Sequence, residues 1–205
     1  MKRTSSVTLA LALLAVTAVP AAAQRAGIAA GATYSSLRGD FLSSSSYEWG
    51  FVGGGYMEWQ FQETTSAQIE LNYAQRGGGG TLAATGEAMS LSVNYLEIPL
   101  RVNLIIPAGE SFEIRGNVGF QLGIALNCKG TVGSGTEQSC GTGVSFTQEE
   151  TIQWTVPLTA GFGYNFGDSK VILEARYNYG LTNVLKGVNI KNRSWDFVLR
   201  FGQAF

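Results

Sequence analysis

Eleven charged residues lie in stretches where polar and apolar residues alternate, and their types could support acid–base or ion-pair chemistry. They are six carboxylates and five arginines: Glu58, Glu70, Arg76, Glu97, Arg101, Glu113, Arg115, Glu174, Arg176, Asp196 and Arg200. Paired carboxylates can exchange protons, but the 205-residue chain has no histidine, the usual base of hydrolytic and acyl-transfer sites. We therefore expect no catalytic residues, no cofactor and no metal site, and we expect the charges to pair with one another.

The two cysteines, Cys128 and Cys140, lie in one Gly/Ser/Thr-rich segment. Two cysteines without histidine make a poor metal site, whereas in an exported protein such a pair forms a disulfide. We expect one disulfide, which would stabilise the protein by about 3 kcal/mol through its effect on the unfolded state.

The charged residues recur at every second position of segments whose other positions are large and apolar. Because the side chains of a strand alternate between its two faces, this pattern predicts β-strands. Eight segments show it, over residues 25–37, 49–61, 66–76, 93–106, 111–126, 152–166, 171–181 and 195–205. On the first, the small residues Gly27, Ala29 and Gly31 should leave room for Arg200, and the last segment is predicted to close the charge network against the first.

The connections between these segments alternate in length. Short turns are expected over residues 62–65, 107–110 and 167–170, and long loops rich in Gly, Ser and Thr over 38–47, 77–92, 127–151 and 182–192. The Gly77–Gly80 run lacks the Lys-Ser/Thr of a phosphate-binding loop, so we expect a flexible loop there. Short turns at one end and long loops at the other are typical of a transmembrane barrel with periplasmic turns and extracellular loops.

The decisive question is which face meets water. A soluble barrel such as a lipocalin hides its apolar face, whereas a membrane barrel turns that face to lipid. The apolar face carries Trp49, Trp59, Trp154 and Trp195, as expected of interfacial aromatic girdles. We therefore predict an all-β, eight-stranded, antiparallel up-and-down transmembrane β-barrel, with a soluble ligand-binding barrel as the alternative.

Both ends of the chain indicate export to the bacterial outer membrane. Residues 1–23 have the layout of a cleaved secretory signal peptide, which leaves 24–205 as one barrel domain. Loss of Lys2 and Arg3 leaves 12 basic against 15 acidic residues, a net charge of −3; with no basic stripe, nucleic acid is not an expected partner. The aromatic residues Trp195, Phe197, Phe201 and Phe205 are expected to address the chain to the barrel-assembly machinery.

Several segments carry a family resemblance. Tyr73-Ala-Gln-Arg-Gly77, Asn94-Tyr-Leu-Glu-Ile-Pro-Leu100 and Ala175-Arg-Tyr-Asn-Tyr-Gly-Leu-Thr-Asn183 resemble the PorT-like outer-membrane β-barrel protein family, as does the opening Ala26-Gly-Ile-Ala-Ala-Gly31. The resemblance implies an eight-stranded outer-membrane barrel, and it implies little chemistry because the porin label of the family is nominal.

Two functions remain open at this stage. The first is a monomeric, non-enzymatic barrel whose charged interior is filled by side chains and which serves envelope structure or surface interaction through its loops. The second is a narrow, porin-like channel for ions or small solutes. An eight-stranded barrel is only wide enough to be filled by side chains, so we favour the first.

Overall fold

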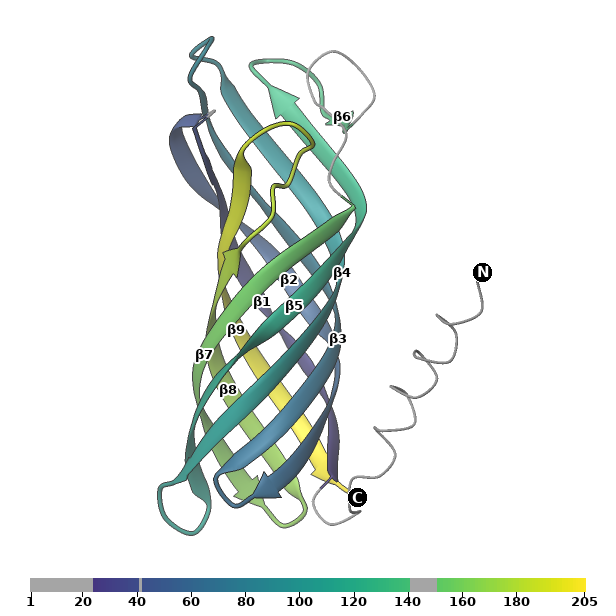
Figure 1. Cartoon of the computed structure of the whole chain (residues 1–205), viewed down its shortest axis with the longest axis vertical. Coiled ribbons are helices and arrows are strands. Elements are labelled where there is room, and N and C mark those ends of the chain that lie inside the picture. Colours follow the sequence, from purple (N-terminus) through teal and green to yellow (C-terminus); the bar gives the residue numbers. More distant parts are fainter. Residues whose placement is uncertain (1–23, 41, 141–150) are drawn as a thin grey trace, which may run out of the picture.

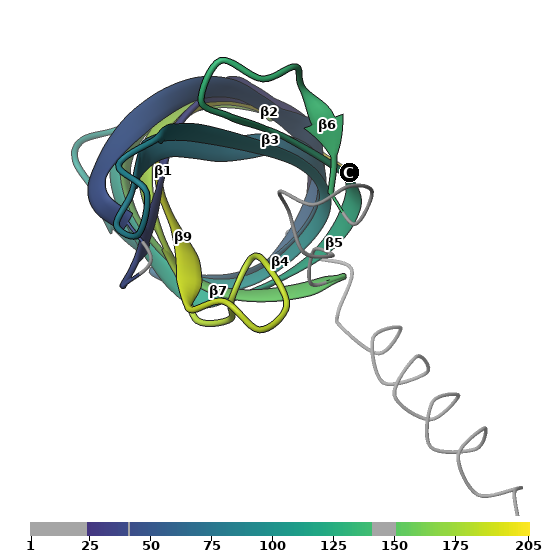
Figure 2. The same ribbon diagram turned by 90° about the horizontal axis from the view of Figure 1, so that it is seen from above.

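The computed structural model describes residues 24–40, 42–140 and 151–205. The expected signal peptide, residues 1–23, lies outside this part of the chain, as do residue 41 and the loop segment 141–150. In the described part the chain forms a tall barrel (Figure 1) that is a closed ring when viewed along its axis (Figure 2).

The ring is built of antiparallel strands joined in chain order. Within the described residues these are β1 (Gln24–Gly39), β2 (Leu42–Gln62), β3 (Thr65–Leu82), β4 (Ala88–Pro107), β5 (Phe112–Val132), β7 (Ile152–Phe166), β8 (Ser169–Gly180) and β9 (Ile190–Ala204). Pairing of β1 with β9 closes the ring. The two-residue strand β6 (Gln138–Ser139) pairs only with β5 and stands outside the ring. The predicted fold, an eight-stranded up-and-down barrel, is confirmed.

Side chains alternate along each strand between the interior of the barrel and its outer wall. On β9, Arg200 is fully buried inside the barrel while its neighbour Leu199 is 56% exposed on the outer wall. Trp195 and Phe205 lie ten residues apart on that wall. At about 3.3 Å per residue and a tilt of about 40°, this corresponds to about 25 Å along the barrel axis, the height of the apolar band of outer-membrane barrels. Aromatic residues therefore flank the lipid-facing zone of this strand at both ends.

At the end that carries the C-terminus, the turns are as short as expected, but at the other end the strands are longer than the sequence predicted. β2 begins at Leu42 rather than at residue 49, β5 runs on to Val132, and β9 begins at Ile190. Much of what was expected to be long loops is therefore strand that continues the barrel beyond the lipid-facing band (Figure 1).

The Gly77–Gly80 run is one correction of this kind. It lies in β3 and pairs with β4, so it is not the flexible loop that we expected. A Cβ atom on Gly78 would stand 2.7 Å from the backbone nitrogen of Leu37, so the absence of a side chain allows the strand to approach β1 closely. Glycine carries no side-chain alternation, which is why the strand pattern was invisible in the sequence here.

In the described part of the chain, no helix is both long enough and apolar enough to span a membrane.

Candidate functional site

All eleven charged residues singled out in the sequence point into the barrel, where each is at most 6% exposed. They come from β2, β3, β4, β5, β8 and β9. A twelfth charge, Lys170, is also buried, and it was missed because we expected residues 167–170 to form a turn. Its even number, shared with Glu174 and Arg176 on the same strand, was the signal that it faces inwards. With Lys170, the described part of the chain places six acidic and six basic buried side chains in the interior.

The interior charges form three layers. In the layer nearest the periplasmic turns, Glu113 accepts hydrogen bonds from Lys170 Nζ (2.7 Å to Oε2) and from Arg115 Nη1 (2.9 Å). The other terminal nitrogen of Arg115 donates to Glu58 Oε1 at 2.6 Å. Ser66 donates a further hydrogen bond to the same oxygen. Every charge in this layer therefore has an opposite partner.

Glu70 and Glu174 are the centre of the middle layer. Both Arg101 and Arg200 contact Glu70 Oε1, and Arg176 Nη2 lies 3.4 Å from Oε2. Glu174 Oε2 lies 2.9 Å from Arg200 Nε and 3.6 Å from Arg101 Nη1. Isolated buried charges are very costly, and in this layer three arginines surround two carboxylates, so that each charge lies beside an opposite one.

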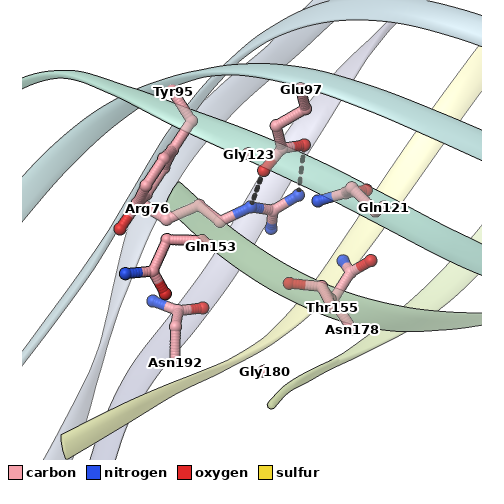
Figure 3. A pocket seen from close by; sticks show the side chains of 10 residues that line it. All are labelled: Arg76, Tyr95, Glu97, Gln121, Gly123, Gln153, Thr155, Asn178, Gly180 and Asn192. Atoms are coloured by element: carbon pink, nitrogen blue, oxygen red, sulfur yellow. Dashed lines mark hydrogen bonds and ion pairs between the residues drawn. The ribbon is translucent and has the colours of Figure 1, made fainter. Parts of the chain in front are cut away.

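Arg76 organises the upper layer (Figure 3). Its guanidinium donates to both oxygens of Glu97, at 2.5 and 3.0 Å, and to both oxygens of Asp196, at 2.8 and 3.0 Å. Asn178 Nδ2 donates to Asp196 Oδ2 at 2.8 Å. A double bidentate arrangement of this kind fixes the arginine rigidly between two strands.

A polar cavity lies beside Arg76, lined also by Tyr95, Gln121, Gln153 and Asn178 (Figure 3). Its volume is about 20 Å³, room for a single water molecule. The cavity is therefore too small to form a channel through the interior.

We expected the charges of β9 to pair with residues of β1, and this prediction is wrong. Ala29 is the register partner of Arg200. However, the charges of β9 pair with β3 and β8 rather than with β1: Arg200 with Glu70 and Glu174, and Asp196 with Arg76. The reason is that β1 offers no acidic residue on its inner face.

Above the charges, the interior becomes apolar. This inner apolar cluster contains Leu37, Leu82, Met89, Leu91, Val93, Tyr95, Cys128, Val184, Leu185 and Ile190. Val184 and Leu185 come from the connection between β8 and β9, which is held to the strand by a hydrogen bond from Val184 N to Ile190 O (2.7 Å). Sequence reasoning missed the cluster because it assigned most of these residues to loops.

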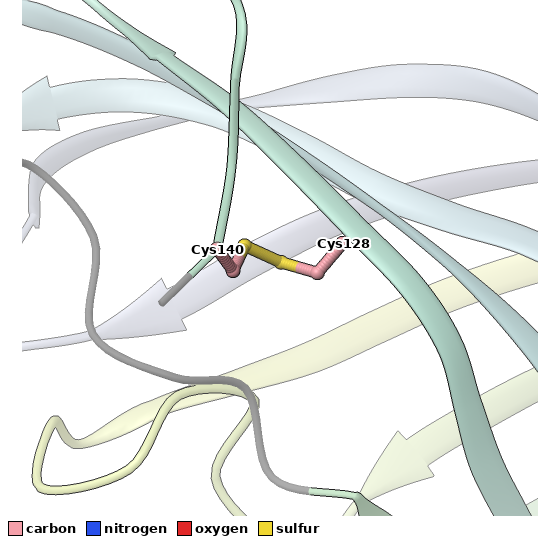
Figure 4. Close-up of a disulfide and its surroundings, with 2 residues drawn as sticks. All are labelled: Cys128 and Cys140. Carbon is pink, nitrogen blue, oxygen red and sulfur yellow. A yellow bond between two sulfur atoms is a disulfide. The ribbon is translucent and has the colours of Figure 1, made fainter. Parts of the chain in front are cut away.

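Cys128 and Cys140 form a disulfide, with 5.4 Å between their Cα atoms (Figure 4). It ties residues 138–140, which are β6 and the residue after it, to β5, beside a backbone hydrogen bond from Cys140 N to Cys128 O (3.0 Å). Next to it, Lys129 and Glu137 form an exposed ion pair of 2.7 Å, and the hydrogen bond that the Lys129 ammonium donates to the Glu137 carboxylate raises the pKa of this ammonium. The disulfide thus anchors this segment to the inner apolar cluster.

A closed ring with charges inside and large apolar residues outside defines a transmembrane β-barrel protein. Residues 22–186 match the family described as outer membrane protein beta-barrel domain, and the chain belongs to this family. The protein is therefore an outer-membrane protein that sits in the lipid of that membrane.

Solved structures of small outer-membrane barrels are similar to this chain. The outer membrane protein OprG from Pseudomonas aeruginosa is 15% identical, with a TM-score of 0.54, over 89% of this chain and 96% of that one. Neisserial surface protein A is 12% identical, with a TM-score of 0.48, over 88% and 97%. Ail, the attachment invasion locus protein of Yersinia pestis, solved with the heparin analogue sucrose octasulfate, is 13% identical, with a TM-score of 0.45, over 87% and 98%.

At these identities the likeness concerns the fold alone. No curated protein matches this chain.

Proposed function

We propose that this protein is a closed, non-conducting and non-enzymatic barrel that acts in envelope structure or in surface interaction through its extracellular end. The observation that carries the proposal is the filled interior: six acidic and six basic side chains, all buried, in three paired layers. A conducting pore needs a continuous path of water, and side chains occupy the place where that path would run.

The extracellular end adds a second barrier. Leu37, Leu91 and Ile190 of the inner apolar cluster are at most 1% exposed, so an ion entering from outside would first have to cross an apolar layer. Charges arranged for transport would instead line a wetted lumen. Both layers favour a sealed barrel over the narrow channel for ions or small solutes.

The targeting and assembly steps are part of the same proposal. Residues 1–23 serve as a cleaved signal peptide, and the barrel-assembly machinery recognises the aromatic end of β9. The exposure of Trp195, Phe197, Phe201 and Phe205 on the outer wall supports this recognition. The mature protein then functions as a monomer.

Membership of the PorT-like branch is proposed on the residues of the resemblance. The segment Asn94–Leu100 forms the middle of β4, where Glu97 contributes to the upper charge layer. This places the most specific sequence segment at a packed part of the barrel wall, which suits a role in barrel architecture and offers no open site for catalysis.

The test is conductance of the refolded protein in planar bilayers, after a heat-modifiability gel has confirmed a folded barrel. We expect the wild type to give no steady single-channel steps. A porin of known conductance, reconstituted in the same bilayers, is the positive control that shows the assay detects an open barrel. Steady steps from the wild type would overturn the sealed barrel and establish the channel.

A further inference from the structure

A row of aromatic residues crosses four adjacent strands on the outer wall of the barrel, near its extracellular end. Trp49, Tyr34, Trp195 and Tyr177 are register partners across β2, β1, β9 and β8. Tyr34 and Trp49 have ring centroids 4.6 Å apart, and Tyr177 and Trp195 are 5.0 Å apart. Such a row marks the level where hydrocarbon gives way to lipid headgroups.

Three basic residues, Arg38, Lys191 and Arg193, stand above this row on β1 and β9; we call them the basic cluster. Lys191 and Arg193 alternate with inward residues and share the outward face with Trp195, and Arg38 is the register partner of Lys191. At about 3.3 Å per residue and a tilt of about 40°, they lie roughly 5–10 Å beyond the aromatic row, which is the depth of the headgroup region.

Tyrosine rings hold the two guanidinium groups in place. The Arg193 guanidinium carbon is 3.4 Å from the centroid of the Tyr179 ring, and its Nη1 lies 3.5 Å from the hydroxyl of Tyr177. On the other side of the cluster, Arg38 lies over Tyr47 at 5.8 Å. Cation–π contacts orient the guanidiniums but leave their charge uncompensated.

No described acidic residue forms an ion pair with the basic cluster. Asp40, the acidic residue closest in sequence, accepts a hydrogen bond from Asn189 instead (3.0 Å). By contrast, Lys129 elsewhere at the extracellular end is paired with Glu137. The basic cluster is thus a site of positive charge without a described protein counter-ion, at the level of the outer-leaflet headgroups.

The periplasmic end of the barrel shows the opposite charge. The turns there carry Glu63, Glu110 and Asp168, each next to or between strand ends. Among the described residues, the periplasmic turns are thus acidic, whereas the wall of β1 and β9 at the extracellular end carries the basic cluster.

We propose that the basic cluster binds the phosphate group of an outer-leaflet lipid headgroup, with the acyl chains of that lipid against the wall below Tyr34 and Trp195. Arginine matches phosphate in geometry and charge, and the aromatic row supports the adjoining sugar or acyl surface. Because the site is on the outer wall, it does not depend on whether the interior conducts.

The test is native mass spectrometry of the refolded barrel in neutral detergent, titrated with diphosphorylated lipid A. We expect one retained lipid per barrel for the wild type, and an affinity lower by about tenfold or more for Arg38→Gln/Lys191→Gln/Arg193→Gln, since each basic residue near an anionic surface contributes separately. Lys129→Gln removes one charge at the same end and should bind as the wild type does. A heat-modifiability gel confirms folding; if the triple variant does not fold, Arg38→Gln and Lys191→Gln singly replace it, each with a smaller loss.

Three results would overturn the proposal. If the basic-cluster variants bound lipid A with an affinity within twofold of that of the wild type, the basic cluster would not be the binding site. If lipid A without its phosphates were retained equally well, phosphate would not be the group that is bound. Displacement of the lipid by millimolar inorganic phosphate alone would show that the cluster takes free phosphate instead of a lipid headgroup.

Discussion

The two halves of strand β4 are built in opposite ways. Odd-numbered residues face inwards along the whole strand, as their burial shows. In the half nearer the periplasm, those inward residues include Glu97 and Arg101, whereas in the extracellular half they are Leu91, Val93 and Tyr95. The same face of the same strand thus changes from charged to apolar between Glu97 and Tyr95.

The outward face of β4 changes at the same place, but there the apolar residues lie towards the periplasm and the polar residues towards the extracellular side. Towards the periplasm it carries Ile98 and Leu100, and towards the extracellular side Ser90 and Ser92. Lipid surrounds the first half and water surrounds the second, and each solvent is met by the side chains that suit it. The outer surface of the membrane therefore lies at the level of Tyr95 and Leu96, and the inward residues of β4 are buried on both sides of this level.

The largest expected effect comes from the charged half. Glu70→Leu leaves Arg101 and Arg200 without their shared carboxylate, and removal of one partner from a buried ion pair costs about 3–5 kcal/mol. Guanidinium unfolding of the refolded barrel, followed by intrinsic fluorescence, measures this loss. Glu110→Leu, in a periplasmic turn, is the matched control, with a change of about 0.5 kcal/mol or less. Equal stability of the two variants would mean that the middle layer contributes nothing.

The apolar half should respond to a loss of volume instead. Leu91→Ala empties space in the inner apolar cluster and should lower the free energy of unfolding by about 2–4 kcal/mol. Ser92→Ala, one residue away but facing water, should change it by about 0.5 kcal/mol at most. The same denaturation experiment reads both variants, and a Leu91→Ala barrel as stable as the wild type would contradict the packed upper interior.

The disulfide should have an effect of similar or smaller size. Cys128→Ser/Cys140→Ser removes the covalent bond between β5 and residues 138–140, and should destabilise the barrel by about 2–3 kcal/mol. Adding a reductant to the wild type should reproduce the loss, while the double variant should not respond to it. Insensitivity of the wild type to the reductant would contradict a stabilising role.

Substitution of a basic-cluster residue on the outer wall should leave the stability of the barrel almost unchanged. Arg193→Gln removes a solvent-facing charge and a contact with Tyr179, so we expect about 1 kcal/mol or less in the free energy of unfolding, against a clear loss of lipid A binding. Thermal denaturation in neutral detergent separates the two effects. A stability loss as large as that of Glu70→Leu would show that this arginine is structural.

The strand pattern could be read from the sequence wherever side chains alternate. Arg200 beside Leu199, and Glu97 beside Ile98, were assigned to their correct faces by parity alone. Polar and apolar residues also alternate over residues 89–95, but here the apolar residues face inwards and the polar ones outwards. We assigned part of this segment to a loop because we looked only for strands whose apolar residues face lipid.

Other features depend on the closed ring and have no local signal. The pairing of Arg76 with Asp196 joins β3 to β9, which are not neighbours in the ring, and only the curvature of the barrel brings them together. The inward position of Val184 follows from the path of its connection, which alternation does not define. The charged residues could thus be predicted, but their partners could not.

We propose that the interior of the barrel is sealed and that the extracellular surface of the membrane lies at Tyr95 and Leu96 of β4. Cysteine accessibility tests it directly in a Cys128→Ser/Cys140→Ser background with three added variants: Ser92→Cys outside and above this level, Val102→Cys outside and below it, and Ala74→Cys inside the barrel. With a small, charged, membrane-impermeant thiol reagent added to intact cells, we predict that only the Ser92→Cys protein is labelled. Labelling of Ala74→Cys at a comparable rate would show a water-filled interior, and labelling of Val102→Cys would show that the membrane surface lies elsewhere.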